Sequence, residues 1–128
     1  MSSSFDKILN KTDLVTLLSD LHKILYSKSF SAKDNILIIQ KSKNKLFMTE
    51  NSFGIDDVVK VLSKLKTENY MKSVLDDKNI NGLYLHEFAI KYNGIKYIYV
   101  KFKIQGNSLI IRVISFHKNE YEVSFPYS

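Results

Sequence analysis

The chain has 128 residues, 45% of them hydrophobic, with a formal net charge of +6 and no cysteine. This length suits one domain with a substantial hydrophobic core, and the lack of cysteine excludes disulfides, thiolate metal sites and cysteine nucleophiles. No apolar run approaches the roughly 18 residues that a membrane span needs, so we expect a soluble, cytoplasmic protein with no membrane partner.

Helical patterns dominate the first half of the chain. From Thr12 to about Tyr26, leucines and isoleucines recur at the spacing of an amphipathic helix, and Thr12 or Asp13 is placed to cap it. Residues 53–66 repeat this pattern, with acidic side chains in the first turn, where they favour the helix dipole. The segment 67–77 predicts a further helical turn.

Between these helices the pattern is mixed. The run "ILII" at residues 36–39 indicates a short strand. The stretch "KSKNK" at residues 41–45 predicts a turn with three exposed lysines. The sequence leaves the structure of the surrounding residues 27–48 open.

The second half of the chain has the alternation typical of β-strands. After a turn at residues 79–82, four segments favour strands: 83–92, 95–104, 108–117 and 121–125. The connections between them, such as Asn93-Gly94, are short enough to force antiparallel hairpins. We therefore predict a single α+β domain spanning the whole chain, with helices in about 1–80 packed on one face of an antiparallel sheet in about 83–125.

The predicted strand 95–104 has two different faces, because alternate side chains of an extended chain point to opposite sides. One face is apolar and is predicted to pack on the core: Ile98, Val100, Phe102 and Ile104. The other face combines aromatic rings with cations: Tyr97, Tyr99, Lys101 and Lys103. Since tyrosine is a good strand former, this second face is either ordinary solvated surface or a functional one.

Basic residues concentrate around this strand. Between Glu87 and Glu120 the chain has no acidic residue but six basic ones: Lys91, Lys96, Lys101, Lys103, Arg112 and Lys118. A local positive field is expected there, and it favours a polyanionic partner such as RNA. A chance gap in the acidic residues is the alternative.

Most enzyme classes lack their minimum motifs in this sequence. It has no HExxH, P-loop or glycine-rich dinucleotide motif, and we predict neither a metal nor a cofactor. His86 in the first predicted strand and His117 at the end of the third flank the strand that carries Tyr99 and Lys101. We expect these side chains to converge on one exposed face. A half-buried structural His86 and an ordinary surface His117 are the alternatives.

Such a set of side chains suits RNA cleavage without a metal. The ribose 2′-hydroxyl must lose a proton as it attacks phosphorus and the leaving 5′-oxygen must gain one, and histidine can mediate both transfers near neutral pH. Lysine and arginine can bind the phosphorane oxygens, and tyrosine can stack on a base or donate a proton. The residue types therefore favour a ribonuclease hypothesis.

Four stretches between Leu46 and His117 carry a resemblance: "GIDDVVKVLSKLKTENYMKS", "LYLHEF", "YIYVKFKI" and "VISFHK". They resemble, in the same order, a helix followed by Leu-x-x-x-x-Phe-Tyr-Lys-Ser, then Trp-Gln-Asp-Val, a Tyr-Leu/Ile-Lys strand and a Val-Ser-Phe-Lys ending. These are motifs of the MqsR family of bacterial type II toxins, which are ribonucleases with a RelE-like fold.

The resemblance implies site residues by position. The family's active-site lysine matches Lys72, its glutamine matches His86 and its catalytic tyrosine matches Tyr99. Its C-terminal lysine matches His117, with Lys118 one step further. Two of the four positions are thus histidine here, which supplies a better acid–base pair than glutamine and lysine. The family also implies a cognate antitoxin as a protein partner.

We therefore predict a metal-independent endoribonuclease toxin of a toxin–antitoxin pair that cleaves RNA through 2′-hydroxyl attack. The predicted catalytic residues are His117 and His86 for proton transfer, Tyr99 for positioning or proton donation, and Lys72. The predicted RNA-binding residues are Lys101, Arg112, Tyr97, Lys103 and Lys118. The alternatives are a non-catalytic RNA- or ribosome-binding protein, and an inhibitor or adaptor that binds another protein on the same fold.

Overall fold

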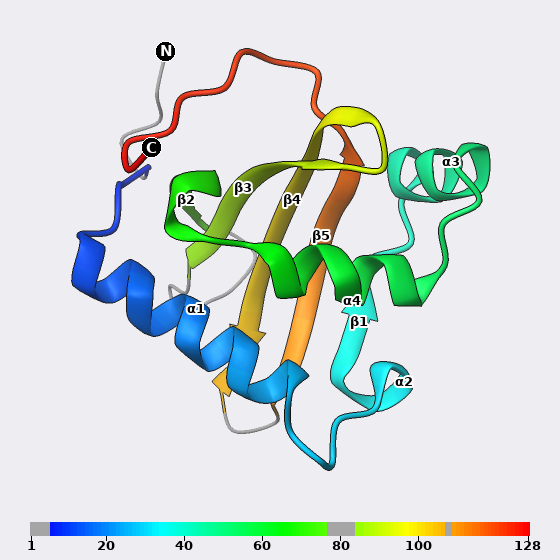
Figure 1. Cartoon of the computed structure of the whole chain (residues 1–128), viewed down its shortest axis with the longest axis horizontal. Coiled ribbons are helices and arrows are strands. Elements are labelled where there is room, and N and C mark those ends of the chain that lie inside the picture. The colour runs from blue at the N-terminus through cyan, green and yellow to red at the C-terminus, as the bar shows by residue number, and fades with distance from the viewer. Residues whose placement is uncertain (1–5, 77–83, 107–108) are drawn as a thin grey trace.

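Figure 1 shows the computed structural model of the chain, which describes residues 6–76, 84–106 and 109–128. Its helices are α1 (Lys11–Leu25), α2 (Ala32–Asn35), α3 (Ser42–Glu50) and α4 (Ile55–Lys64), followed by a 3-10 turn, η1 (Thr67–Asn69). Its strands are β1 (Ile36–Ile38), β2 (Tyr70–Leu75), β3 (Tyr84–Tyr92), β4 (Ile95–Gln105) and β5 (Ile110–Lys118). They form one sheet in the order β1-β5-β4-β3-β2, so the predicted α+β class is confirmed.

The two predicted amphipathic helices are present as α1 and α4, and both lie over the same face of the sheet (Figure 1). The cap of α1 differs from the prediction. The side chain of Asn10, two residues before Thr12, accepts a hydrogen bond from the Asp13 amide at 2.8 Å. Asparagine satisfies a free helix N–H as well as the predicted caps would. In the described part of the chain, no helix is long and apolar enough to cross a membrane.

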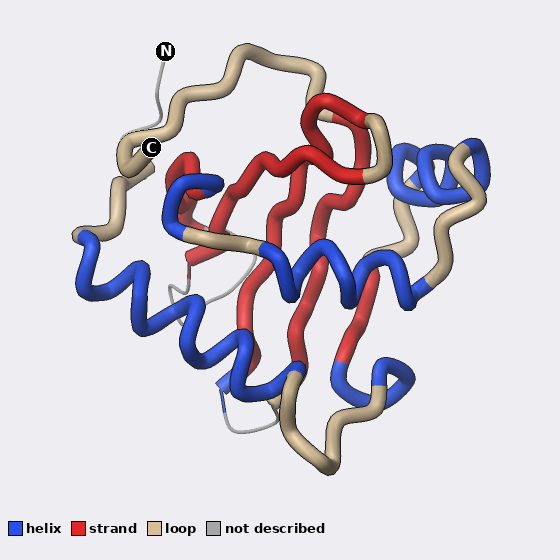
Figure 2. Tube along the Cα trace, viewed as in Figure 1, coloured by secondary structure: helices blue, strands red, loops and turns tan. Residues whose placement is uncertain are grey.

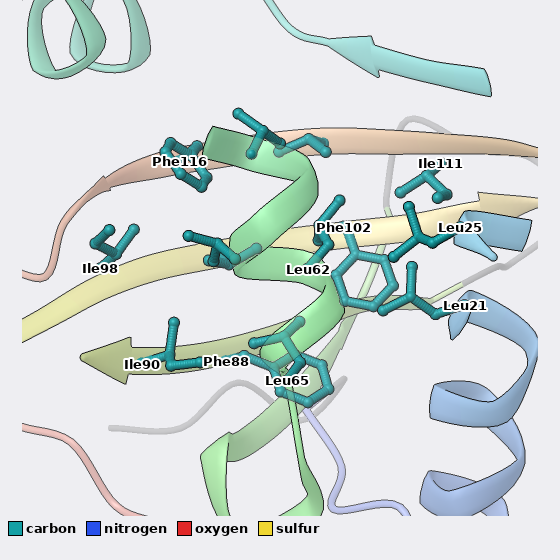
Figure 3. Packing of buried hydrophobic residues seen from close by; sticks show 14 of the residues in the cluster. Leu21, Leu25, Leu62, Leu65, Phe88, Ile90, Ile98, Phe102, Ile111 and Phe116 are labelled. Atoms are coloured by element: carbon teal, nitrogen blue, oxygen red, sulfur yellow. The ribbon is translucent and has the colours of Figure 1, made fainter. Parts of the chain in front are cut away.

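The hydrophobic core lies between these helices and the sheet (Figure 3). Leu21 of α1 and Leu62 of α4 are fully buried against the aromatic rings of the sheet. Phe88 of β3 and Phe102 of β4 stack with centroids 5.6 Å apart, and neither has any exposed surface. The apolar face predicted for residues 95–104 is therefore the core face of β4.

The turn between β3 and β4 follows the sequence signal. Asn93 and Gly94 have φ angles of 52° and 83°, both in the left-handed region that a type I′ hairpin turn requires. The pairing then shifts by one residue, because Tyr92 is opposite Ile95 but Ile90 is opposite Ile98. β4 thus contains one extra residue just after the turn, a β-bulge.

Two segments predicted to be non-β belong to the sheet or to its support. The helical turn predicted for residues 67–77 is confined to η1, and residues 70–75 form β2 antiparallel to β3. The turn predicted for residues 41–45 opens helix α3 instead. The strand predicted from "ILII" is present as β1, but it pairs in parallel with β5. These strands depend on partners far away in the chain, which local periodicity does not reveal.

Asn44 of α3 takes the place of a strand neighbour for β5. Its side-chain nitrogen donates to the carbonyl oxygens of Ile39 at 3.0 Å and Ile114 at 3.1 Å, and its oxygen accepts from the Phe116 amide at 2.9 Å. Ile114 is an extra residue in β5, because Ser115 and Val113 pair with consecutive residues of β4. Asn44 is 1% exposed, so these three bonds anchor α3 where β1 ends.

The segment after β5 is a loop, so the strand predicted at residues 121–125 is wrong (Figure 2). It runs from the end of β5 towards the start of α1 (Figure 1). There the Tyr127 hydroxyl donates to the Leu9 carbonyl at 2.6 Å, and its ring stacks on that of Tyr70. The predicted turn at residues 79–82 and the ends of the predicted strands at 83 and 108 lie outside the described residues.

Candidate functional site

A cavity of about 760 Å³ lies on the face of the sheet opposite α1 and α4. Four strands supply its floor, since Lys72 of β2, Glu87 of β3, Lys101 of β4 and His117 of β5 all line it. The residues around the start of α3 and the C-terminal loop form its walls. It combines carboxylate, ammonium, phenol and imidazole groups in one hollow.

The strand register arranges these side chains in two rows across the sheet. In the first row Lys72 is opposite Glu87, Glu87 is opposite Lys101, and Lys101 is opposite Ser115. In the second row Ala89 is opposite Tyr99, and Tyr99 is opposite His117. Side chains directly opposite each other in an antiparallel pair have Cβ atoms about 5 Å apart. The strand pairing therefore places basic and acidic side chains next to one another.

Glu87, which is buried, and Tyr99, which is partly buried, form a polar pair. Glu87 is only 7% exposed although it is a carboxylate. Burial raises the pKa of the Tyr99 hydroxyl well above its ordinary value, and the charge of Glu87 and the hydrogen bond to it raise this pKa further. Tyr99 therefore keeps its proton and donates to the Glu87 carboxylate, which it orients. This rules out Tyr99 as a base at neutral pH.

His117 presents one ring nitrogen to the cavity. Its Nδ1 lies 3.0 Å from the Lys118 carbonyl oxygen, and because a carbonyl can only accept, Nδ1 carries a proton and donates it. Nε2 is then the nitrogen that exchanges a proton with a ligand. The imidazole and the Tyr99 ring are in contact, with centroids 5.4 Å apart.

The lysines of the cavity have different partners. Lys72 pairs with Asp6 at 2.9 Å, and this hydrogen bond raises the pKa of Lys72. Lys43 pairs with Glu120 of the C-terminal loop at 2.7 Å. Lys41 donates instead to the hydroxyl of Ser115 at 2.8 Å. The cavity therefore contains both neutralised and un-neutralised ammonium groups.

His86 does not join this site, so the expected convergence of His86 and His117 on one face is wrong. Continuing the pairing of Tyr92 with Ile95 without interruption would place His86 opposite Lys101, on the cavity face. The extra residue in β4 places His86 opposite Phe102 instead and Glu87 opposite Lys101. A one-residue shift in register exchanges the two faces of a strand. His86 consequently lies on the helix-covered face.

On that face His86 is part of a buried chain of hydrogen bonds. The Leu9 amide donates to the Tyr70 hydroxyl at 3.1 Å, which lies 2.8 Å from the Ser73 hydroxyl. The Ser73 hydroxyl lies 2.7 Å from Nδ1 of His86. In this chain each group donates to the next: the Leu9 amide to Tyr70, the Tyr70 hydroxyl to Ser73, and the Ser73 hydroxyl to Nδ1 of His86. Nδ1 can accept only if it carries no proton, so the imidazole is neutral. Burial first, and the charge of Lys7 second, lower the pKa of His86 to about 4.

His86 makes the protein less stable in acid. In the unfolded chain His86 binds a proton below its ordinary pKa of 6.5, whereas in the folded protein it does so only near pH 4. Stability from this group is full above that ordinary pKa and is lost as the pH falls. Between about pH 7 and about pH 4.5, wild type should lose about 2 kcal/mol more unfolding free energy than His86→Gln. Urea unfolding across this pH range measures the difference, and parallel curves would contradict it.

The remaining predicted RNA-binding residues lie outside the cavity. Lys103 is 7% exposed and pairs with Asp76 at 2.8 Å. Arg112, opposite Lys103, donates to the Gln105 side chain at 3.4 Å. The two others sit at the far end of the sheet: Tyr97, which packs against Phe125 with centroids 5.6 Å apart, and Lys118, which is exposed at the end of β5.

Sequence reasoning missed several residues that line the cavity, and three of them belong to the candidate site: Glu87, Ser115 and Lys41. A signal for Ser115 exists, since it alternates with His117 along β5. No local signal indicates Glu87 or Lys41, because one depends on the bulge in β4 and the other on the anchoring of α3.

Within the described residues, no group of three or more histidine, aspartate or glutamate side chains is placed to hold a metal ion. Comparisons of the chain with known proteins identify no relative. It matches no protein-family model, and neither curated proteins nor solved structures give a match. The resemblance to the MqsR family therefore stays a prediction, and any function has to be argued from the cavity itself.

Proposed function

We propose that the protein is a metal-independent endoribonuclease whose active site is the cavity on the open face of the sheet. The observation that carries this proposal is that Glu87, Lys101 and His117 line the same hollow. A base, a cation and an acid are the groups that 2′-hydroxyl attack on a phosphodiester requires.

The base in this proposal is Glu87, which replaces His86. A carboxylate oxygen of Glu87 accepts the proton of the ribose 2′-hydroxyl. Tyr99 donates to Glu87 and holds the carboxylate in place. The freed 2′-oxygen attacks phosphorus, and Lys101, directly opposite Glu87, stabilises the charge that develops on the phosphorane oxygens.

The acid is His117. As the bond from phosphorus to the 5′-oxygen breaks, the protonated Nε2 gives its proton to that oxygen. The products are a 2′,3′-cyclic phosphate on one fragment and a 5′-hydroxyl on the other. Glu87 and His117 stand on the two strands that flank β4, offset by two residues, so their backbones are roughly 12 Å apart. In this proposal one phosphodiester lies between their side chains.

The purified protein should cut single-stranded RNA in the presence of EDTA. The expected ends are a 2′,3′-cyclic phosphate and a 5′-hydroxyl, because no water or metal takes part in the first step. Mass spectrometry of the fragments identifies both ends. A matched oligonucleotide with 2′-deoxyribose at the cut position should remain whole there, because it lacks the nucleophile.

Intact RNA that is nevertheless retained by the protein in a salt-dependent manner would contradict this proposal. It would favour the non-catalytic RNA-binding alternative, in which the lysines of the cavity bind phosphates and its aromatic rings stack on bases. Absence of any RNA binding at low salt would favour the protein-binding alternative.

The biological role follows from the resemblance to the MqsR family. A toxin of this kind arrests growth of the cell that makes it, and a cognate antitoxin prevents the arrest. In this protein the surface for such an antitoxin is the mouth of the cavity, which includes the exposed Tyr121 of the C-terminal loop. An antitoxin bound there would exclude RNA from Glu87 and His117.

A further inference from the structure

Two lysines of the cavity lie next to one buried hydroxyl. Lys41 donates to Ser115 Oγ at 2.8 Å, and Lys101 is directly opposite Ser115 in the sheet. Among the residues that the structure describes, neither lysine forms an ion pair with a carboxylate, in contrast to Lys43 and Lys72. Two cations that are not ion-paired therefore face one hollow, although the Glu87 carboxylate lies directly opposite Lys101.

Ser115 is arranged as a donor towards the cavity. It is 1% exposed, and its oxygen accepts a hydrogen bond from Lys41. The hydroxyl hydrogen remains available to a further acceptor, and the Lys41 ammonium group has two more N–H donors. The group thus offers several donors and needs an acceptor with more than one oxygen.

The start of α3 adds positive charge at the same wall. Lys41 is the N-cap residue of α3 and makes no side-chain cap, so the first amides of the helix keep their donors. Lys41 and Lys43, on either side of the first helical residue, both line the cavity. A helix N-terminus carries a partial positive charge that favours anions, phosphate in particular.

The positive charge of Lys41 is unfavourable in the folded protein. Burial, and after it the nearby charges of Lys101 and Lys43, lower the pKa of Lys41. Like charges that share a site repel each other, and an anion between them removes the repulsion. Such an arrangement is typical of a binding site and unfavourable as a purely structural contact.

We propose that Lys41 and Ser115, bordered by Lys101, form a phosphoryl-binding subsite next to the reacting centre. On the proposed function, on which the identity of the ligand rests, it takes the RNA phosphate that neighbours the one being cut. Ser115 and His117 are two residues apart on β5, or roughly 7 Å, a step that suits successive phosphates of an extended strand. Lys101 is directly opposite Ser115 and diagonal to His117, so it borders both positions.

The test uses inorganic phosphate and an uncleavable 2′-O-methyl RNA oligonucleotide as probes, with NMR titration and binding at several salt concentrations. Lys41→Met should weaken phosphate binding about tenfold and lower the slope of log affinity against log salt by about 0.7, the value for one phosphate contact on a single strand. Lys45→Met, which removes the same charge from an exposed position on α3, should change neither. Lys41→Arg keeps the cation and should retain most of the affinity.

A functional lysine and a structural one give different results in these variants. Because Lys41 is held against like charges, Lys41→Met should melt no lower than wild type, which separates loss of binding from loss of folding. Equal phosphate affinity in wild type and Lys41→Met, or none in either, would overturn the subsite. RNA cleavage with an unchanged salt slope in Lys41→Met would also overturn it and leave the ribonuclease standing. Lysine-dependent phosphate binding by a protein that never cuts RNA supports the subsite and refutes the ribonuclease.

Discussion

Glu87→Gln lowers the rate of RNA cleavage by about 10³-fold, within the range that a general base contributes. Glutamine has the shape of glutamate and still accepts the hydrogen bond from Tyr99, but it cannot take the proton of the 2′-hydroxyl. His117→Ala removes the acid and has an effect of similar size. The measurement is the single-turnover cleavage rate with saturating protein, so that changes in affinity do not enter.

The pH dependence assigns the two roles. Wild type should give a bell-shaped profile, because a general base and a general acid take part in the same reaction. The cleavage rate of Glu87→Gln should no longer rise with pH on the acid side of the profile. The cleavage rate of His117→Ala should no longer fall on the alkaline side. Exposed Glu50 of α3 offers the matched control, and Glu50→Gln should cut RNA at the wild-type rate. A Glu87→Gln protein that is folded and cuts within twofold of wild type would remove Glu87 from the mechanism.

Asn44→Ala should lower the free energy of unfolding by about 3 kcal/mol, because it leaves two backbone groups without a partner at about 1–3 kcal/mol each, with partial relief by water. The groups are the carbonyl of Ile114 and the amide of Phe116, whereas the Ile39 carbonyl keeps the hydrogen bond that it accepts from the Lys41 amide at 3.0 Å. Asn44→Asp should be no better, since it turns a second oxygen towards the two carbonyls. Urea unfolding measures the change.

Asn51 provides the comparison from the other end of the same helix. It is exposed and makes a single side-chain bond, to the Phe47 carbonyl at 2.9 Å. Asn51→Ala should cost less than about 1 kcal/mol, because water replaces that bond. Equal losses for the two alanine variants would show that Asn44 does not anchor α3 to β5.

The parts of the fold that could be predicted from the sequence are those with local signals. The apolar periodicity of α1 and α4 is visible within each helix. Asn93-Gly94 specifies its own turn, and β3, β4 and β5 alternate strongly enough to be recognised. By contrast, β1 and β2 are short and are stabilised by strands far away in the chain, so their residues carry no decisive pattern of their own.

The candidate site could be predicted only where the alternation of side chains along one strand decides which face a residue occupies. Tyr99, Lys101 and His117 lie in the cavity because each stands on the polar side of its own strand. The choice between His86 and Glu87 depends on how β3 pairs with β4, and one inserted residue decides it. Lys41 comes from outside the sheet, and its place depends on hydrogen bonds that Asn44 makes to a distant strand.

The extra residue of β4 also bears on how such a site diverges. His86 and Glu87 are neighbours in the chain, and the register determines which of them reaches the cavity. Loss of one residue between the turn and Ile98 would shift the register, so that His86 replaced Glu87 at the centre of the site. The amino-acid sequence of β3 itself would stay the same. Evolution could thus exchange the reactive group of this cavity by a deletion. A sequence alignment would show a gap in β4 and no substitution at positions 86 and 87 of β3.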